Sequence, residues 1–356
     1  MFDLVCTILG LFMIGLTAVD VFSTVFYPRT GKSVLSLRIC QSVWALFRGC
    51  SRLAGIQNKA ILSYCGPCLL IVIVSVWVWA FTIGFALLFW PALGTGIQAS
   101  QGETPTDFAT ALYYSGFTLT TLGVGDLVPK SGVWRLVSIT EAAVGFSVIT
   151  ASLTYLMSVY NALTRRNTFA LSLHHCTNDP QNTASMLLGL KGHGQFEPAL
   201  SQLKDISRDL LFLLEAHHDY PILHFFRFEE VYYSLGRISF VCLDLVTLIK
   251  TALDPQVYGS LLTASATIEL ENSAYALLTQ LAESFLESRY LKQPSHPKEW
   301  RAYYFEAIAT LQQHEVETVS DLPQGADHYV QARDRWNHYS RAVTVYMEYD
   351  WSDVVQ

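Results

Sequence analysis

Three stretches of the chain, residues 4–26, 67–90 and 133–160, are almost continuously apolar. Each is long enough to cross a bilayer as a helix, because a spanning helix needs about 20 apolar residues. The first is not typical of a secretory signal peptide, since Asp3 is its only early charge and no clear small-residue cleavage site is present. The pattern therefore predicts three membrane-spanning helices in the first 160 residues.

Beyond Asn161 the apolar residues become sparser and recur at the three- and four-residue spacing of amphipathic helices. Alternating β-branched runs are scarce, and prolines separate the helical stretches. A region of this length can bury a core of its own. We therefore expect residues 161–356 to form an α-helical domain, in which the clearest run is Leu200, Leu203, Ile206, Leu210 and Leu214.

The charge balance changes at the same point. Residues 1–160 carry eight Lys/Arg and six Asp/Glu, whereas residues 161–356 carry fifteen and twenty-four. The acidic second region gives no support for nucleic-acid binding, which needs a basic surface. With 51% hydrophobic and 15% charged residues, the whole chain is too apolar for an ordinary soluble protein.

The connection at residues 28–65 contains no acid and all six bases between Asp20 and Glu103: Arg29, Lys32, Arg38, Arg48, Arg52 and Lys59. The positive-inside rule places it in the cytoplasm. The N-terminus and residues 91–132 are then outside, and Arg165 and Arg166 meet the third span on the inner side. We expect a multi-pass protein of the cell membrane with a cytoplasmic C-terminal domain.

Apolar residues lie among the bases of this connection, so it could be an amphipathic helix on the inner leaflet. A longer helical hairpin fits equally well. A voltage sensor would need arginines at regular three-residue steps on a spanning helix, which this irregular spacing does not provide.

Residues 104–126 lie between the second and third spans. Thr104 and Pro105, with Asp107 three residues after the threonine, predict a helix start with Thr104 as its cap. A short apolar helix from Phe108 to about Leu119 should follow, and then Thr120 and the segment Thr121, Leu122, Gly123, Val124, Gly125 and Asp126. Glycines allow backbone conformations that can aim successive carbonyls at one axis, and four copies could then replace the hydration shell of K⁺.

This segment resembles the pore region of potassium channels, over residues 107–161 and the preceding span. Family filters usually read Thr-Val-Gly-Tyr-Gly-Asp. The resemblance implies pore-helix support by Tyr113, Tyr114, Phe117 and Thr120, a basic residue at Arg135 and a hinge at Gly145. It also implies K⁺ binding at Thr121, Leu122, Gly123 and Val124, a homotetramer in lipid, and a cavity lined by Phe146, Ile149, Leu153, Thr154 and Met157.

The sequence departs from the family pattern at two positions. Val124 replaces the usual tyrosine, and Phe117 stands where some relatives carry an acid that pairs behind the filter. A non-selective cation channel and a non-conducting membrane-anchored sensor or scaffold therefore stay open as alternatives. A pore-loop transporter would carry four such loops in one chain, and this chain has one.

Two acids fall inside predicted spans. Glu141 should lie roughly 140° from the centre of the cavity stripe at about 100° per residue, so we expect a buried link to a neighbouring helix, charged or protonated, and no ion ligand. Asp20 invites the same interpretation near the inner end of the first span. Both would be costly as unpaired charges at that depth.

Other motifs add no chemistry to this picture. Cys65-Gly66-Pro67-Cys68 opens an apolar run, which favours a helix start over a redox tetrad. Residues 189–194 lack dinucleotide-binding spacing. His174-His175-Cys176 and His217-His218, with His193 and His224, are interpreted as ordinary histidines and not as a metal site. We expect no enzyme activity and no cofactor apart from conducted K⁺; a cytoplasmic ligand is an open question.

The chain is thus expected to be an all-α membrane protein. Its predicted parts are a spanning helix at residues 1–27, a basic connection at 28–65, a pore domain at 66–160 with its filter at 121–126, and a helical cytoplasmic domain at 161–356. That last domain could regulate opening or serve only in assembly.

Overall fold

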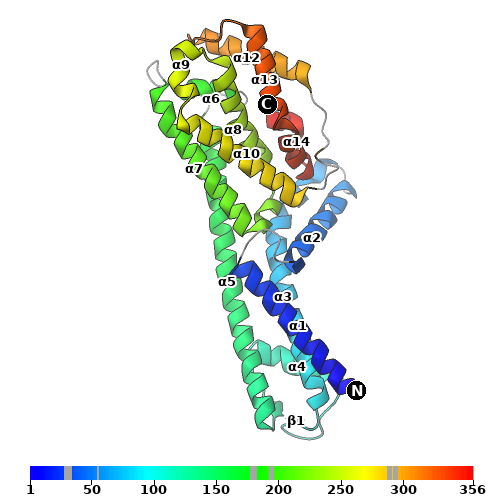
Figure 1. Cartoon of the computed structure of the whole chain (residues 1–356). Coiled ribbons are helices and arrows are strands. Elements are labelled where there is room, and N and C mark those ends of the chain that lie inside the picture. The colour runs from blue at the N-terminus through cyan, green and yellow to red at the C-terminus, as the bar shows by residue number, and fades with distance from the viewer. Residues whose placement is uncertain are drawn as a thin grey trace. The chain divides into compact units, whose positions relative to one another are not determined.

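The computed structural model describes residues 1–27, 34–53, 56–176, 183–191, 196–286, 291 and 296–355 (Figure 1). Arg29, Lys32 and His193 lie outside these residues. The chain divides into two compact units. The first comprises Met1–Ala45 and Gly66–Tyr160, and the second comprises Leu46–Cys65 and Asn161–Gln356.

Three helical segments are long and apolar enough to cross a membrane, as the hydropathy pattern predicts: Phe2–Val25, Lys59–Ala92 and Gly132–His175. They contain helices α1 (Phe2–Val25), α3 (Cys65–Phe89) and α5 (Gly132–His175). Helix α5 does not end where its apolar run ends, at Tyr160. No glycine or proline occurs between Gly145 and His175, so nothing local stops the helix there.

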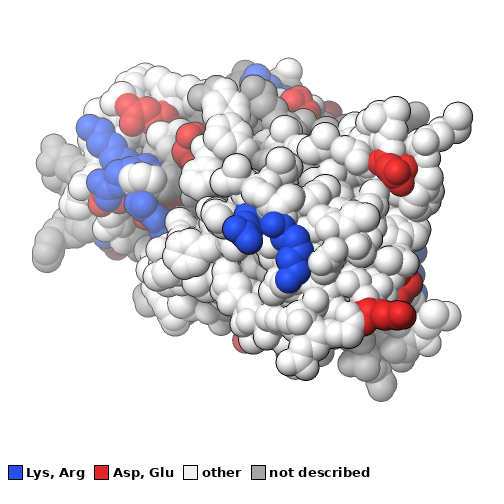
Figure 2. All heavy atoms as spheres, turned by 90° about the horizontal axis from the view of Figure 1, so that it is seen from below, with Lys and Arg blue, Asp and Glu red and all other residues white. Residues whose placement is uncertain are grey.

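Helices α1 and α3 cross closely at two glycines. A Cβ on Gly10 would lie 2.6 Å from the carbonyl oxygen of Gly84, and a Cβ on Gly84 would lie 2.8 Å from a side-chain carbon of Ile14. Small residues commonly allow such approaches between membrane helices. The other faces of α1 expose apolar side chains. Figure 2 shows a largely uncharged surface when the molecule is seen from below, with Lys and Arg gathered near its centre and at the left.

Asp20 ties three helices of the first unit together. Its Oδ2 accepts hydrogen bonds from Ser36 Oγ at 2.7 Å and from Trp77 Nε1 at 2.9 Å. Ser36 belongs to α2 (Val34–Leu53) and Trp77 to α3. The buried link expected for Asp20 is therefore present, and it uses neutral donors.

A short hairpin and the helix α4 (Phe108–Leu119) connect α3 to α5. Strand β1 (Ile97–Ala99) pairs antiparallel with β2 (Leu127–Pro129), and the 3₁₀ turn η2 (Trp90–Ala92) precedes them. Helix α4 has the predicted bounds, but the predicted cap is wrong. Asp107 caps it by accepting from Thr110 N at 3.0 Å, while Thr104 Oγ1 accepts from Ala99 N.

The second unit is a helical assembly around α8 (Leu235–Ala252), which is buried almost all round. Helices α6, α10, α13, α14 and α15 contact it. The remaining described elements are η3 (Pro221–Phe225), η4 (Val231–Tyr233) and the helices α6 (Thr183–Gly189), α7 (Glu197–Asp219), α9 (Pro255–Leu262), α10 (Ser265–Phe285), α12 (Pro297–Gln313), α13 (Leu322–Asp334), α14 (Asn337–Tyr346) and α15 (Trp351–Val355).

The end of α2 and the 3₁₀ segment η1 (Ile56–Tyr64) belong to this second unit. Arg48 and Arg52 each form an ion pair with Glu348 at 2.9 Å, and Lys59 pairs with Asp350 at 2.6 Å. The guanidinium of Arg227 donates to the carbonyls of Lys59 and Met347. Half of the basic connection is thus fixed to residues near position 348.

Candidate functional site

The backbone after α4 alternates in conformation. Thr121, Gly123 and Gly125 have φ values of +58°, +60° and +82°, whereas Leu122 and Val124 between them have negative φ. The left-handed region is easy for glycine but an outlier for a β-branched residue such as threonine. Strain of this kind clusters at functional sites and persists only where the surroundings hold it.

This alternating segment turns its polar backbone outward from the single chain. Residues 120–126 are all exposed, with Leu122 at 71% and Val124 at 51%. The N–H groups of Leu122 and Gly123 donate to the carbonyl of Phe117. Within the described residues, the carbonyls of residues 121–125 accept no hydrogen bond. Five consecutive acceptors are therefore available to something outside the chain.

Aromatic rings of α4 pack together beside this segment. The Phe117 ring lies 5.2 Å from the rings of both Tyr113 and Tyr114, edge to face. The Tyr113 hydroxyl lies close to the Asp126 carboxylate at the end of the segment. Phe117 thus makes an apolar cluster at the position where some potassium channels carry an acid. Thr120 caps α4 and its hydroxyl donates to the carbonyl of Gly116.

The far end of the segment is anchored to the hairpin. Asp126 accepts from Ser100 N through its carbonyl and from Leu127 N through its carboxylate. Gly96, just before β1, lies so close to the Trp134 ring that a Cβ there would be 2.2 Å from it. The two ends of the segment are therefore held by α4 on one side and by β1, β2 and α5 on the other.

The predicted cavity residues of α5 lie on one exposed face of the single chain. Phe146, Leu153 and Met157 are 68%, 58% and 66% exposed, and Ile149 and Thr154 are exposed as well. The buried face of the same stretch consists of other residues: Gly145, Val148, Ala151, Ser152, Tyr155 and Val159. The five predicted residues therefore share a face that is free to meet another chain or solvent.

Gly145, predicted as a hinge, makes a close contact with α4. A Cβ at this position would lie 1.9 Å from the carbonyl oxygen of Leu119, the final residue of α4. The contact alone requires glycine here. The resemblance to potassium channels predicts only the hinge, and the sequence pattern gave no sign of this contact.

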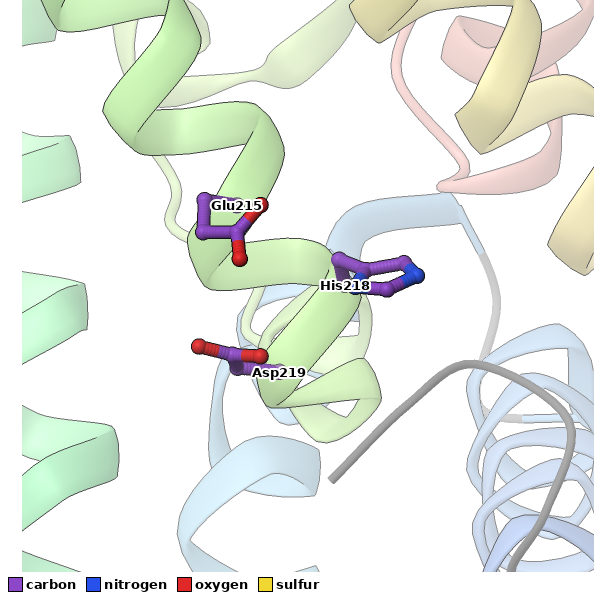
Figure 3. A group of neighbouring side chains, drawn as sticks. All are labelled: Glu215, His218 and Asp219. Atoms are coloured by element: carbon purple, nitrogen blue, oxygen red, sulfur yellow. The ribbon is translucent and has the colours of Figure 1, made fainter. Parts of the chain in front are cut away.

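The histidine pairs of the second unit have separate environments. His174 stacks on Tyr232, and His217 is buried with Nδ1 bonded to the carbonyl of Leu213. His218 lies instead beside Glu215 and Asp219 on α7, with one ligand atom of each within 4.8 Å of the others (Figure 3). Acidic groups on one exposed helical turn commonly gather without an ion, and we assign none to this group.

Comparison with known proteins bears directly on the segment between α3 and α5. Residues 69–162 match the family model described as "Ion channel". This part of the chain is an ion-channel pore domain. The match contains most of α3, all of α4, the alternating segment and the first part of α5, which are the elements of a two-transmembrane-helix pore of the potassium-channel type.

A second comparison covers more of the chain. It is 32% identical over 219 residues to the "Uncharacterized membrane protein YdjJ" of Bacillus subtilis (strain 168). The alignment covers 62% of this chain and 62% of that protein, so the chain spans less than two thirds of its relative. No solved structure matches the chain.

One buried charge of the second unit has a role that sequence reasoning missed. Arg166 follows the third apolar stretch, and the sequence pattern identifies it only as a positive charge that indicates the inner side of the membrane. In the structure only 2% of this residue is exposed. It donates to the carbonyls of Leu223 and Phe226 at 3.0 and 2.9 Å. The two carbonyls lie more than fifty residues away along the chain, and no local pattern announces such partners.

Proposed function

We propose that the chain is one subunit of a homotetrameric, potassium-selective channel. The alternating backbone of Thr121, Gly123 and Gly125, with carbonyls that accept no bond within the described chain, is the observation that carries the proposal. Rings of backbone carbonyls replace the hydration shell of K⁺ in potassium channels. One chain contributes one strand of such a ring, so four copies are needed to enclose an ion.

The surroundings of the segment support the same proposal. Unpaired backbone groups at membrane depth are tolerated only where protein encloses them or water fills the path. The C-terminal end of α4 directs its negative dipole end toward the start of the segment, which favours a cation there. The exposed stripe of Phe146, Ile149, Leu153, Thr154 and Met157 would line the cavity below.

The decisive experiment is current recording from purified protein in a defined bilayer. We expect a current whose reversal potential follows the K⁺ gradient and not the Na⁺ gradient. A reversal potential that follows both gradients would indicate a non-selective cation channel, and no current would indicate a non-conducting scaffold.

Gly123→Ala tests the assignment of the filter. The position has open space for a methyl group, but its φ of +60° is costly for alanine by roughly 1–2 kcal/mol in each subunit. We expect the current to be lost while the tetramer persists on a sizing column. Gly15→Ala is the matched control, because a Cβ there meets nothing within 4 Å and no positive φ is involved. An unchanged conductance in Gly123→Ala would contradict the assignment.

We further propose that the N-terminus faces outward and that the basic connection and the second unit are cytoplasmic. The run of unopposed bases in that connection supports this orientation. Cys50 on α2 and Cys176 after α5 are both exposed native thiols. A membrane-impermeant thiol reagent should modify both cysteines only after cells are permeabilised. Modification in intact cells would contradict the proposed orientation.

A further inference from the structure

Helix α5 follows α4 along a seam with three contacts, which we call the pore-helix seam. The hydroxyls of Tyr114 and Ser138 are 2.7 Å apart, and Ser115 Oγ and Glu141 Oε1 are 2.5 Å apart. The third contact is the close approach of Gly145 to the carbonyl of Leu119. Residues 138, 141 and 145 recur at helical spacing, so one face of α5 contacts α4 down to its final turn.

The oxygens around Ser115 define where protons must lie. Ser115 Oγ is 2.8 Å from the carbonyl oxygen of Thr82 on α3 and 2.5 Å from Glu141 Oε1. A serine hydroxyl has one proton to donate, and a carbonyl oxygen has none. Two hydrogen bonds among these three oxygens therefore need a second proton, which only the Glu141 carboxyl can provide.

The surroundings of Glu141 agree with a neutral acid. The side chain is fully buried, and Oε2 has no hydrogen-bond partner within the described residues. No described Lys, Arg or His forms an ion pair with it. A charge buried in a membrane helix without a partner is costly, whereas a protonated carboxyl that donates one good hydrogen bond is not.

We propose that Glu141, in its protonated form, is a positioning residue for the ion-conducting segment. It donates to Ser115, and Ser115 donates to Thr82, so that α5, α4 and α3 are joined behind the pore. Ser115 lies one helical turn before Leu119, and the strained Thr121 follows two residues later. The link fixes the end of α4 from which the alternating backbone starts. The inference rests on the proposed channel function.

The test compares Glu141→Gln with Glu141→Leu in the full-length protein. Glutamine keeps the volume, an acceptor and a donor group, so we expect its K⁺-to-Na⁺ permeability ratio to stay within about twofold of the original. Leucine removes the link, and we expect the ratio to fall by about tenfold or the current to decay during recording. A Glu141→Gln channel as impaired as Glu141→Leu, or a Glu141→Leu channel with unchanged selectivity, would overturn the proposal.

Ser115→Ala removes the same hydrogen-bonded link from the α4 side. It keeps the proposal testable if the Glu141→Leu protein does not fold. It should reproduce the loss of selectivity, and combining it with Glu141→Leu should add little, because both remove one interaction. Additive losses would mean that the two residues act separately and would overturn the proposal.

Infrared spectroscopy tests the proton without any current. The original protein should show a protonated-carboxyl C=O band that Glu141→Gln lacks, and absence of that band would overturn the inference. An original protein that passes no current but shows the band would overturn the proposed function and leave the neutral link in place. The two failures are therefore distinguishable.

Discussion

Two fully buried carboxyls, one in each unit, show opposite ways of keeping an acid out of water. In the second unit, Asp244 accepts from the hydroxyls of Tyr329 and Tyr303 at 2.5 and 3.1 Å, and Arg333 Nη1 is 3.4 Å away. In the first unit, Glu141 contacts one serine, and no described cation forms an ion pair with it. Asp244 can remain charged because a buried arginine compensates it, whereas Glu141 fits its site only with a proton.

The difference follows from what each environment offers. Arg333 is 1% exposed and lies over aromatic rings, with its guanidinium carbon 4.9 Å from the Phe240 centroid and 5.5 Å from the Trp300 centroid. The helical second unit gathers such a set of partners from several helices. A helix in the membrane has fewer polar side chains around it. Protonation is therefore the least costly way, in free energy, to neutralise an acid there.

The largest effect should come from removing the cation of the second unit. Arg333→Met removes the charge that compensates the buried Asp244 carboxyl, which should cost about 3–5 kcal/mol. Cys242 on α8 is fully buried and reports opening of this core. We expect its modification by a thiol reagent, followed by peptide mass, to accelerate at least about a hundredfold.

The matched control removes both charges. Tyr329 and Tyr303 donate to different oxygens of Asp244. Asp244→Asn combined with Arg333→Met keeps an acceptor for one tyrosine and offers an N–H₂ donor to the hydroxyl of the other, so most of the protection of Cys242 should return. A double variant that is as labile as Arg333→Met alone would show that Arg333 acts through packing and not through charge.

A smaller effect should follow acidification of the second unit. Burial, together with the nearby charge of Arg166, lowers the pKa of His217 to about 3. Burial also holds the pKa of His224 well below its usual range. Both rings are therefore neutral in the folded protein, and the stability they contribute is present above about pH 6.5 and lost as pH falls toward the folded pKa.

Between pH 7 and pH 5, each such histidine should cost about 2 kcal/mol of stability, since only the unfolded chain takes up the proton. His217→Phe should remove about half of the loss that the pair produces. Cys242 protection measured at the two pH values checks this. An acid dependence identical to that of the original chain would exclude His217 as a contributor.

The smallest expected effect concerns Asp20 and distinguishes it from Glu141, the other buried carboxyl of the first unit. Asp20 serves only as an acceptor, for Ser36 and Trp77, whereas Glu141 must donate. Asp20→Asn places an amide N–H₂ near a donor and should cost about 1 kcal/mol in thermal stability. Glu141→Gln should change stability less. The reverse order would mean that the proton has been assigned to the wrong acid.

The sequence was informative where local chemistry decides the structure. The spans and α4 follow from hydropathy and helical spacing, and the glycine spacing of residues 121–126 points to the segment whose backbone alternates. It was less informative where distant partners decide. The cap of α4 moved to Asp107 because the Thr104 hydroxyl is used by Ala99.

Other features have no local signal at all. The strands β1 and β2 have three residues each, too few for an alternation pattern to be recognised. Glu141 could be predicted to point away from the cavity stripe, because helical geometry fixes that angle. Its partner Ser115 could not, because the packing of α4 on α5 determines it.

The ion pairs between the α2 end and Glu348 have a consequence for biogenesis. Arg48 bonds to a residue 300 positions later in the chain. At about 5–20 residues per second, a ribosome needs roughly 15–60 s to make that intervening stretch. The apolar helices can enter the membrane during this time. Arg48, Arg52 and Lys59 cannot form their ion pairs until Glu348 and Asp350 have been synthesised. The connection is therefore among the last parts of the protein to reach its final structure, and a nascent chain stalled before Glu348 would leave it exposed to chaperones and proteases.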